Sequence, residues 1–302
     1  MPLLLGCDFS SAPSARKPIV VALGGLDGDA VRLRGFERFV TLDAWGEWLA
    51  RQPRWVGGFD LPFGLPRELV TQLGWPLRWN ALIAHFASLG RTEIRDTFAA
   101  FCAARPAGGK FAHRCTDGPA GSSPSMKWVN PPVAFMLHAG VPRLLAAGAA
   151  LPGLHRPDAA TGRVALEAYP GLLARELIGR RSYKSDDAAR QDDARRAARE
   201  ELLAALRAGA SRLGLRLSID DPLLARLILE DASADHLDAV ICLLQAAWGF
   251  ERRTSPGPGY GLPAAIDPVE GWIVTALEDQ ASPCPTALRG RDRPGADAAA
   301  ID

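Results

Sequence analysis

The sequence predicts an α/β fold in which helices flank a mixed β-sheet. Short apolar runs of strand length alternate with longer segments whose apolar residues recur at helical spacing. The chain has 302 residues and is 48% hydrophobic, which is enough for one large core. We therefore expect a single domain over residues 1–280 with a large helical and loop insertion at about 67–160. Residues 281–302 are of low complexity, and we expect them to be disordered.

The N-terminal third predicts four strands. Residues 2–8, 19–23 and 30–36 suit an antiparallel meander, because a turn-forming Gly-Gly-Leu-Asp-Gly-Asp sequence joins the second and third runs. A helix predicted over 41–50 leads to a fourth strand at 55–60. Because this connection is long and helical, the fourth strand should run parallel to the first. The paired glycines within the fourth strand predict close approach by a neighbouring backbone.

The middle of the chain predicts helices around one long loop. Residues 67–105 have a helical pattern, and residues 106–130 form a loop rich in Gly, Pro and Ser that is long enough to be functional. A further helix is expected over 132–148. Residues 151–155 and 163–169 are then expected to pair as strands around a turn.

The C-terminal third predicts helices and one short strand. One helix should begin at Gly171 and another should be capped by Ser185, while Asp221, which precedes a proline, should start the penultimate helix. Residues 215–219 suit a short strand. The segment 234–249 is apolar on most of its surface, so it should be a core helix.

Five acids lie at the ends of these elements. Asp8, Asp60 and Glu167 each end a predicted strand, and Asp235 and Asp238 share one face of the first turn of the core helix. Helix capping is the alternative for the last two, because Asp is favoured at N-caps and near the positive end of the helix dipole. Capping explains one of them and leaves the second as a coincidence.

These acids predict a metal site. Ligand sites in open sheets form outside the carboxyl ends of parallel strands, where these side chains would meet. Gathered carboxylates repel one another and raise one another's pKa unless a cation neutralises them. Oxygen ligands favour Mg²⁺ or Mn²⁺ over zinc, and the five cysteines are scattered without metal-ligand spacing.

Five ordered motifs resemble the DUF429 family of predicted nucleases, which is placed in the ribonuclease H-like superfamily. The motifs are Gly6-Cys7-Asp8-Phe9-Ser10, Gly58-Phe59-Asp60-Leu61-Pro62, Glu167-Ala168-Tyr169-Pro170, Asp235-His236-Leu237-Asp238-Ala239 and Glu270-Gly271-Trp272-Ile273. The resemblance implies a five-stranded mixed sheet whose first three strands are antiparallel. It also implies phosphodiester hydrolysis with two Mg²⁺ or Mn²⁺ ions, which activate a water and stabilise the leaving oxygen.

The resemblance assigns roles to the acids. Asp8 would bridge the two metals, Asp60 would be the acid of the fourth strand, and Asp235 and Asp238 the acids of the final helix. Glu167 matches the Glu-x-Tyr-Pro motif, and we expect it to be a fifth catalytic and metal-binding acid. The partner would be DNA or RNA.

Substrate contacts are expected from polar and basic residues near these motifs and in the 106–130 loop. The composition of the loop, with basic groups around an aromatic residue, suits a phosphate backbone and a stacked base, although an ordinary solvated loop has the same composition. The candidates are Ser10, Arg114, Lys127, Asn130 and Lys184.

The composition limits the possible partners and the location of the protein. The formal net charge of +1 gives no overall basic field, so a nucleic acid would have to meet a local patch. The odd number of scattered cysteines suits reduced thiols in a cytoplasmic protein, and no apolar stretch predicts a membrane span. The oligomeric state is left open.

Two other function classes remain at this point. A phosphotransferase of the sugar-kinase or actin-like type would also end its first strand in Gly-x-Asp, but it requires a second half-domain that the sequence does not reveal. A non-catalytic nucleic-acid-binding module would use the 106–130 loop and would not depend on Asp8.

Overall fold

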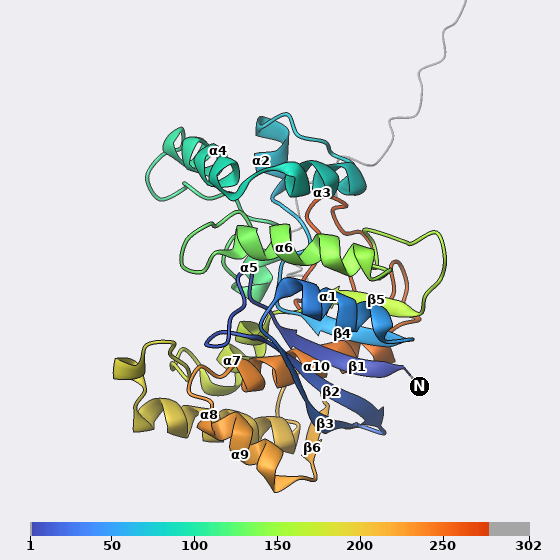
Figure 1. The fold of residues 1–302 in the computed structure, drawn as a ribbon, viewed down its shortest axis with the longest axis vertical. Helices are drawn as coiled ribbons and strands as arrows, with labels where there is room; N and C mark the ends of the chain where they lie inside the picture. Colours follow the sequence, from blue (N-terminus) through green and yellow to red (C-terminus); the bar gives the residue numbers. More distant parts are fainter. Residues whose placement is uncertain (1, 278–302) are drawn as a thin grey trace, which may run out of the picture.

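A six-stranded mixed sheet forms the centre of the computed structural model, which describes residues 2–277 (Figure 1). The strand order is β5-β4-β1-β2-β3-β6. The strands are β1 (Leu3–Asp8), β2 (Ile19–Asp27), β3 (Ala30–Phe39), β4 (Trp55–Phe59), β5 (Arg163–Glu167) and β6 (Arg216–Ile219). The predicted tail at 281–302 lies outside the described residues.

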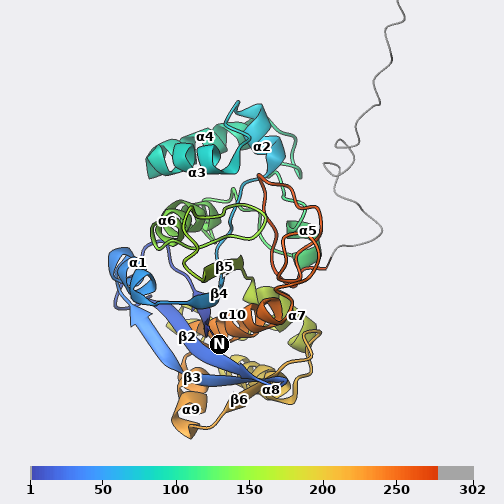
Figure 2. The same cartoon turned by 90° about the vertical axis from the view of Figure 1, so that its right-hand side faces the viewer.

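Ten α-helices are described around the sheet. They are α1 (Leu42–Arg51), α2 (Arg67–Gln72), α3 (Trp79–Ser88), α4 (Arg91–Ala103), α5 (Asp117–Ala120), α6 (Val133–Ala146), α7 (Pro170–Ile178), α8 (Asp193–Ala208), α9 (Pro222–Glu230) and α10 (Asp235–Glu251). In both views α2, α3 and α4 lie at one end of the molecule beyond α6, whereas α8 and α9 lie near the other end beside β6 (Figures 1 and 2). None of the helices within 2–277 is long and apolar enough to cross a membrane.

The strand directions confirm the predicted meander and crossover. β1 pairs antiparallel with β2, and β2 pairs antiparallel with β3. β4 lies parallel to β1 on its other side, and β5 lies parallel to β4. The sheet has six strands rather than the five implied by the resemblance, because β6 adds to the free edge of β3 in parallel.

The predicted strand pair at 151–155 and 163–169 is wrong in its first half. Pro152 and Gly153, which has a φ of +79°, turn the chain back on itself, so Leu151 and His155 form only an isolated bridge. The second half is β5, and it pairs with β4 instead.

Two helix predictions also need correction. Ser185 does not cap a helix; Asp192 does, because its side chain accepts a hydrogen bond from the Arg195 amide and α8 follows. The region 67–105 is divided into α2, α3 and α4, and the following loop contains the short helix α5.

Two apolar cores cover the two faces of the sheet. Strand residues alternate between them, as the pleat requires. Leu4 and Val56 face the core that contains α7, α8 and α10, whereas Leu5 and Phe59 face the core that contains α1, α3, α4 and α6. The insertion therefore covers one face of the sheet, and α10 covers the other.

Glycines bring α10 directly against the two central parallel strands. A Cβ atom at Gly6 of β1 would lie 2.0 Å from the Ala239 carbonyl oxygen, and one at Gly58 of β4 would lie 2.4 Å from that of Cys242. The close backbone approach predicted from the glycines of the fourth strand is thus confirmed at Gly58. This contact fixes the position of α10 along the sheet, because no side chain separates the two backbones.

We expect the Gly6→Ala substitution to lower the free energy of unfolding by about 3 kcal/mol or more, because helix or strand must move to admit the methyl group. Gly35→Ala in β3 is the matched control, since a Cβ atom there meets nothing within 4 Å. Denaturant unfolding of both variants measures the difference. Equal midpoints for the two variants would contradict the backbone contact.

Candidate functional site

Asp8 and Asp60 lie side by side at the carboxyl edge of the sheet. Asp8 is the last residue of β1, and Asp60 directly follows β4. The Asp60 amide donates a hydrogen bond of 2.9 Å to the Cys7 carbonyl, which continues the pairing of the two parallel strands by one residue. By the alternation of the pleat, Asp8 shares its face with Leu4 and Gly6, the face covered by α10.

The first turn of α10 completes a cluster of four carboxylates. Asp235 and Asp238 are 4% and 0% exposed, and Asp8 is 9% exposed. The charges of Asp238, Asp235 and Asp60 all act on Asp8 and raise its pKa. The four acids that the sequence predicted to converge from β1, β4 and the core helix therefore do converge. We call these four residues the acid cluster.

Helix capping does not account for Asp235 and Asp238. Residue Ala234 precedes the helix in a left-handed conformation with a φ of +59° and offers no side-chain cap. The start of α10 is instead held by Asp231, whose carboxylate accepts hydrogen bonds from the His236 amide at 3.0 Å and the His236 Nδ1 at 2.7 Å. Neither acid of the first turn is needed to begin this helix.

Two lysines bind the two helix acids. Lys17 Nζ lies 2.6 Å from Asp235 Oδ1, and Lys184 Nζ donates to Asp238 Oδ2. The Tyr183 hydroxyl donates to the other oxygen of Asp238 at 2.7 Å. The desolvation of Lys17 opposes its charged form, but Asp235 and Asp8 outweigh this effect and raise the lysine pKa.

Asp8 and Asp60 have no such partners. Neither carboxylate accepts a hydrogen bond from any residue in the described part of the chain. Burial raises the pKa of Asp8 well above its usual value, and the neighbouring acids add to this. Burial likewise raises the pKa of Asp60 to about 7, although Lys184 opposes the shift. The two buried carboxyl groups thus lack a partner at hydrogen-bond distance, and their raised pKa values favour the neutral, protonated form.

The donor set fits a hard divalent cation in its chemistry, although the acids are not arranged around one. Among residues 2–277, no three His, Cys, Asp or Glu side chains stand together as the ligands of one ion. Two of the four acids are turned towards lysines instead. The oxygens of Asp8 and Asp60 lack hydrogen-bond donors, and carboxylate oxygens are the ligands that Mg²⁺ and Mn²⁺ prefer.

Glu167 faces the other side of the sheet from the acid cluster, although its charge still acts on Asp60 and raises the pKa of that acid. It pairs with Phe59 in the register of β4 and β5, one residue before Asp60, and Ala165 on the same side of β5 belongs to the core beneath the insertion. One step along a strand reverses the direction of the side chain. The prediction from strand ends therefore placed Glu167 at the correct edge of the sheet. It could not determine on which face of the sheet the side chain lies.

The contacts of Glu167 form a buried ion-pair network. Its Oε1 accepts from Arg114 Nη2 at 2.7 Å, and its Oε2 accepts from Arg114 Nη1 and the Phe63 amide, each at 2.9 Å. Arg114 also binds Asp117, and both side chains are almost fully buried. Burial raises the pKa of Glu167, while Arg114 opposes this shift.

The predicted substrate-binding residues separate into three groups. Lys184 contacts the acid cluster, as described above. Arg114 was expected to hold phosphate, but it is 3% exposed and its guanidinium is committed to Glu167 and Asp117, so it belongs to the buried network. Within residues 2–277, the side chains of Lys127 and Asn130 in the 106–130 loop form no hydrogen bond or ion pair with the acids, and Ser10 Oγ accepts a hydrogen bond from the Ala12 amide alone.

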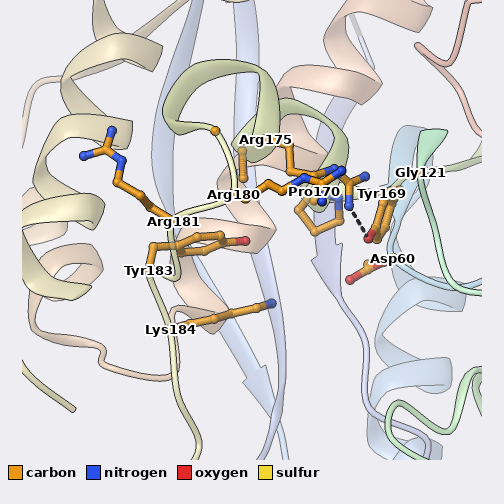
Figure 3. Close-up of a pocket in the computed structure, with 12 residues that line it drawn as sticks. Asp60, Gly121, Tyr169, Pro170, Arg175, Arg180, Arg181, Tyr183 and Lys184 are labelled. Atoms are coloured by element: carbon orange, nitrogen blue, oxygen red, sulfur yellow. Dashed lines mark hydrogen bonds between the residues drawn. The ribbon is translucent and has the colours of Figure 1, made fainter. Parts of the chain in front are cut away.

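Sequence reasoning missed Lys17 and several residues around a cavity next to Asp60. Lys17 lies just before β2, and β2 is the hairpin partner of β1, so counting back from the Asp8–Val20 pair would have brought it to the end of β1. The cavity has a volume of about 510 Å³ and is bordered by Asp60, Tyr183 and Lys184 (Figure 3). Arg175 and Arg180 on its wall had no sequence motif to mark them.

Residues 138–258 match the DUF429 family. Its model is described as a protein of unknown function, and the matched segment includes Glu167, Lys184, Asp235 and Asp238. The family predicted from the ordered motifs is confirmed over this part of the chain. No curated protein and no solved structure matched the chain significantly.

Because Asp60 has a pKa raised to about 7, its contribution to stability is present at low pH and is lost as pH rises from about 4 to about 7. We expect Asp60→Asn to raise the melting temperature by several degrees in EDTA near pH 8, since the buried charge is removed, and to change it little near pH 5. Thermal unfolding at both pH values measures this. A pH-independent effect would contradict the raised pKa.

Glu167→Gln should lower the free energy of unfolding by about 3 kcal/mol, because an amide group would face the buried donors of Arg114 and Phe63. If Asp8 binds Mg²⁺, adding Mg²⁺ should raise the melting temperature of the wild-type protein. The same increase should be seen in Glu167→Gln and be absent from Asp8→Asn. Loss of the Mg²⁺ effect in Glu167→Gln alone would instead make Glu167 a metal ligand.

Proposed function

We propose that this protein is a divalent-metal-dependent nuclease with a ribonuclease H-like fold. The observation that carries the proposal is the pair of buried carboxylates, Asp8 and Asp60, that form no ion pair and accept no hydrogen bond among the described residues, while Lys184 acts on both only from a distance. Such groups are costly to bury unless a cation binds them. They lie outside the carboxyl ends of two parallel strands, where ligand sites of open sheets form.

The topology supports the fold assignment. The first three strands are antiparallel within a mixed sheet, as the resemblance implied, and the fourth is parallel to the first, as the helical connection predicted. A sugar-kinase or actin-like phosphotransferase requires a second half-domain, whereas residues 2–277 form a single six-stranded sheet. The DUF429 match adds support over residues 138–258.

Mg²⁺ or Mn²⁺ bound here would lower the pKa of a water and stabilise the charge of the leaving oxygen in phosphodiester hydrolysis. Asp8 and Asp60 would hold the cation, and Asp235 and Asp238 would join them from α10. When ionised, Asp8, Asp60 and one substrate phosphate would together offer three negative charges, which would offset three of the four positive charges of two divalent ions.

The other residues of the site have positioning roles in this proposal. Lys17 and Lys184 neutralise Asp235 and Asp238, and so hold the first turn of α10 in place before a cation binds. Glu167 holds the Phe63 amide, and thereby fixes the segment that follows Asp60. Glu167 would therefore affect the reaction through the position of Asp60.

The test is hydrolysis of labelled DNA, RNA, hybrid and branched substrates with Mg²⁺ or Mn²⁺. Asp8→Asn should lower the rate at least about 100-fold, because loss of one charged ligand at the reacting centre costs several kcal/mol. Asp27→Asn is the matched control, since Asp27 is an exposed acid at the opposite end of the sheet.

Retention of cleavage in Asp8→Asn would contradict the proposed site. Absence of cleavage in the wild-type protein with every substrate and both ions would contradict the proposed activity. Nucleic-acid binding that survives in Asp8→Asn without any cleavage by the wild type would instead identify a binding module.

A further inference from the structure

The cavity beside Asp60 lies between the start of α7 and the segment that follows this helix. Its lining includes Tyr169 and Arg175 from the α7 side and Arg180 and Lys184 from the segment that follows (Figure 3). Asp60 borders it, so the cavity reaches the acid cluster at this residue. Its volume of about 510 Å³ lies within the range of roughly 300–1,000 Å³ in which pockets hold small ligands.

Two hydrogen bonds hold the Arg175 side chain in place and leave some of its N–H donors unused. Its Nη2 donates to the Ala120 carbonyl at 2.5 Å, and its Nη1 donates to the Tyr169 hydroxyl at 3.4 Å. Gly121, with a φ of +59°, permits this approach, because a Cβ atom there would lie 2.8 Å from Nη2. A guanidinium has five N–H donors, so three of them remain for another acceptor.

Arg180 is the second unneutralised cation of the cavity. It is exposed, and no ion pair or hydrogen bond of its side chain is found within residues 2–277. The other two cations are already paired, Arg181 with Glu201 and Lys184 with Asp238. Two cations that form no ion pair among residues 2–277 therefore lie beside Asp60, a carboxyl group without a hydrogen-bond donor.

This arrangement suits a phosphate ester that passes the acid cluster. A phosphate beside Arg175 and Arg180 would gain charge-assisted hydrogen bonds, and guanidinium groups favour phosphate through their paired donors. The half-buried Tyr169 ring, which packs over Gly171 and has the Arg175 guanidinium 5.4 Å from its centroid on one side, adds an aromatic group to the same wall. A cavity of this size admits an unpaired nucleotide, whereas the interior of a duplex does not enter it.

We propose that this cavity binds an unpaired nucleotide of a single-stranded nucleic acid, with its phosphate on Arg175 and Arg180, next to the bond presented to the acid cluster. The inference rests on the proposed nuclease function and narrows its substrate to single strands or frayed ends. Proteins that hold single strands combine basic grooves with aromatic surfaces in this way.

The experiment measures binding separately from cleavage, in EDTA. Fluorescence anisotropy would follow a short labelled single strand of DNA, one of RNA, and a blunt DNA hairpin, at salt concentrations between about 50 and 200 mM. Arg180→Gln should weaken single-strand binding about tenfold and make the slope of log affinity against log salt shallower by about 0.7, the value for one phosphate contact on a single strand. Arg207→Gln, an exposed arginine in the last turn of α8, should change neither.

Several results would overturn the proposal. These are wild-type affinity in Arg180→Gln, equal effects of Arg180→Gln and Arg207→Gln, or hairpin binding as tight as single-strand binding. A mononucleotide that competes with the labelled strand and binds as tightly as the strand itself would show that the ligand is a free nucleotide. Single-strand binding that depends on Arg180, in a protein that cleaves nothing, would leave the cavity assignment intact and remove the nuclease proposal.

Discussion

The contact of the α10 backbone with β1 and β4 determines where the acid cluster forms. Gly6 and Gly58 lie on the same face of neighbouring parallel strands, and at both positions the carbonyl oxygens of α10 occupy the space of a Cβ atom. A helix held at two such points can neither slide nor rotate without a clash. Its first turn must therefore lie at the edge where β1 and β4 end, and this brings Asp235 and Asp238 to Asp8 and Asp60.

The same contact explains why the site is electrostatically strained. The close packing of α10 on the strands brings the four acids together in a buried place, and burial raises the pKa of Asp8, Asp60 and Asp235. Lys17 and Lys184 relieve half of the charge from outside the helix. Asp8 and Asp60, at the ends of β1 and β4, have no lysine at ion-pair distance.

The sequence predicted correctly which strands and which helix carry the site residues. It did not predict as well on which face of the sheet each side chain lies. Asp8 and Asp60 were predicted from strand ends and from a helical crossover that forces parallel strands, and both rules depend only on local pattern. The face of Glu167 depends on the register of β5 against β4, which is a long-range property that no local pattern specifies. The same limit applies to Lys17, whose place follows from hairpin register, and to Arg175, which is positioned by a carbonyl of α5.

The two groups of buried acids in this molecule differ in one respect that bears on function. In the Arg114 network, both oxygens of Glu167 and both oxygens of Asp117 accept hydrogen bonds, so the network is satisfied by the chain itself. In the acid cluster, a few residues away along the same sheet edge, Asp8 and Asp60 accept none from the described chain. A buried carboxylate without donors lowers the stability of the native state. The fold evidently can satisfy buried acids at this edge, so the unsatisfied pair is better explained by a ligand that completes it than by a failure of packing.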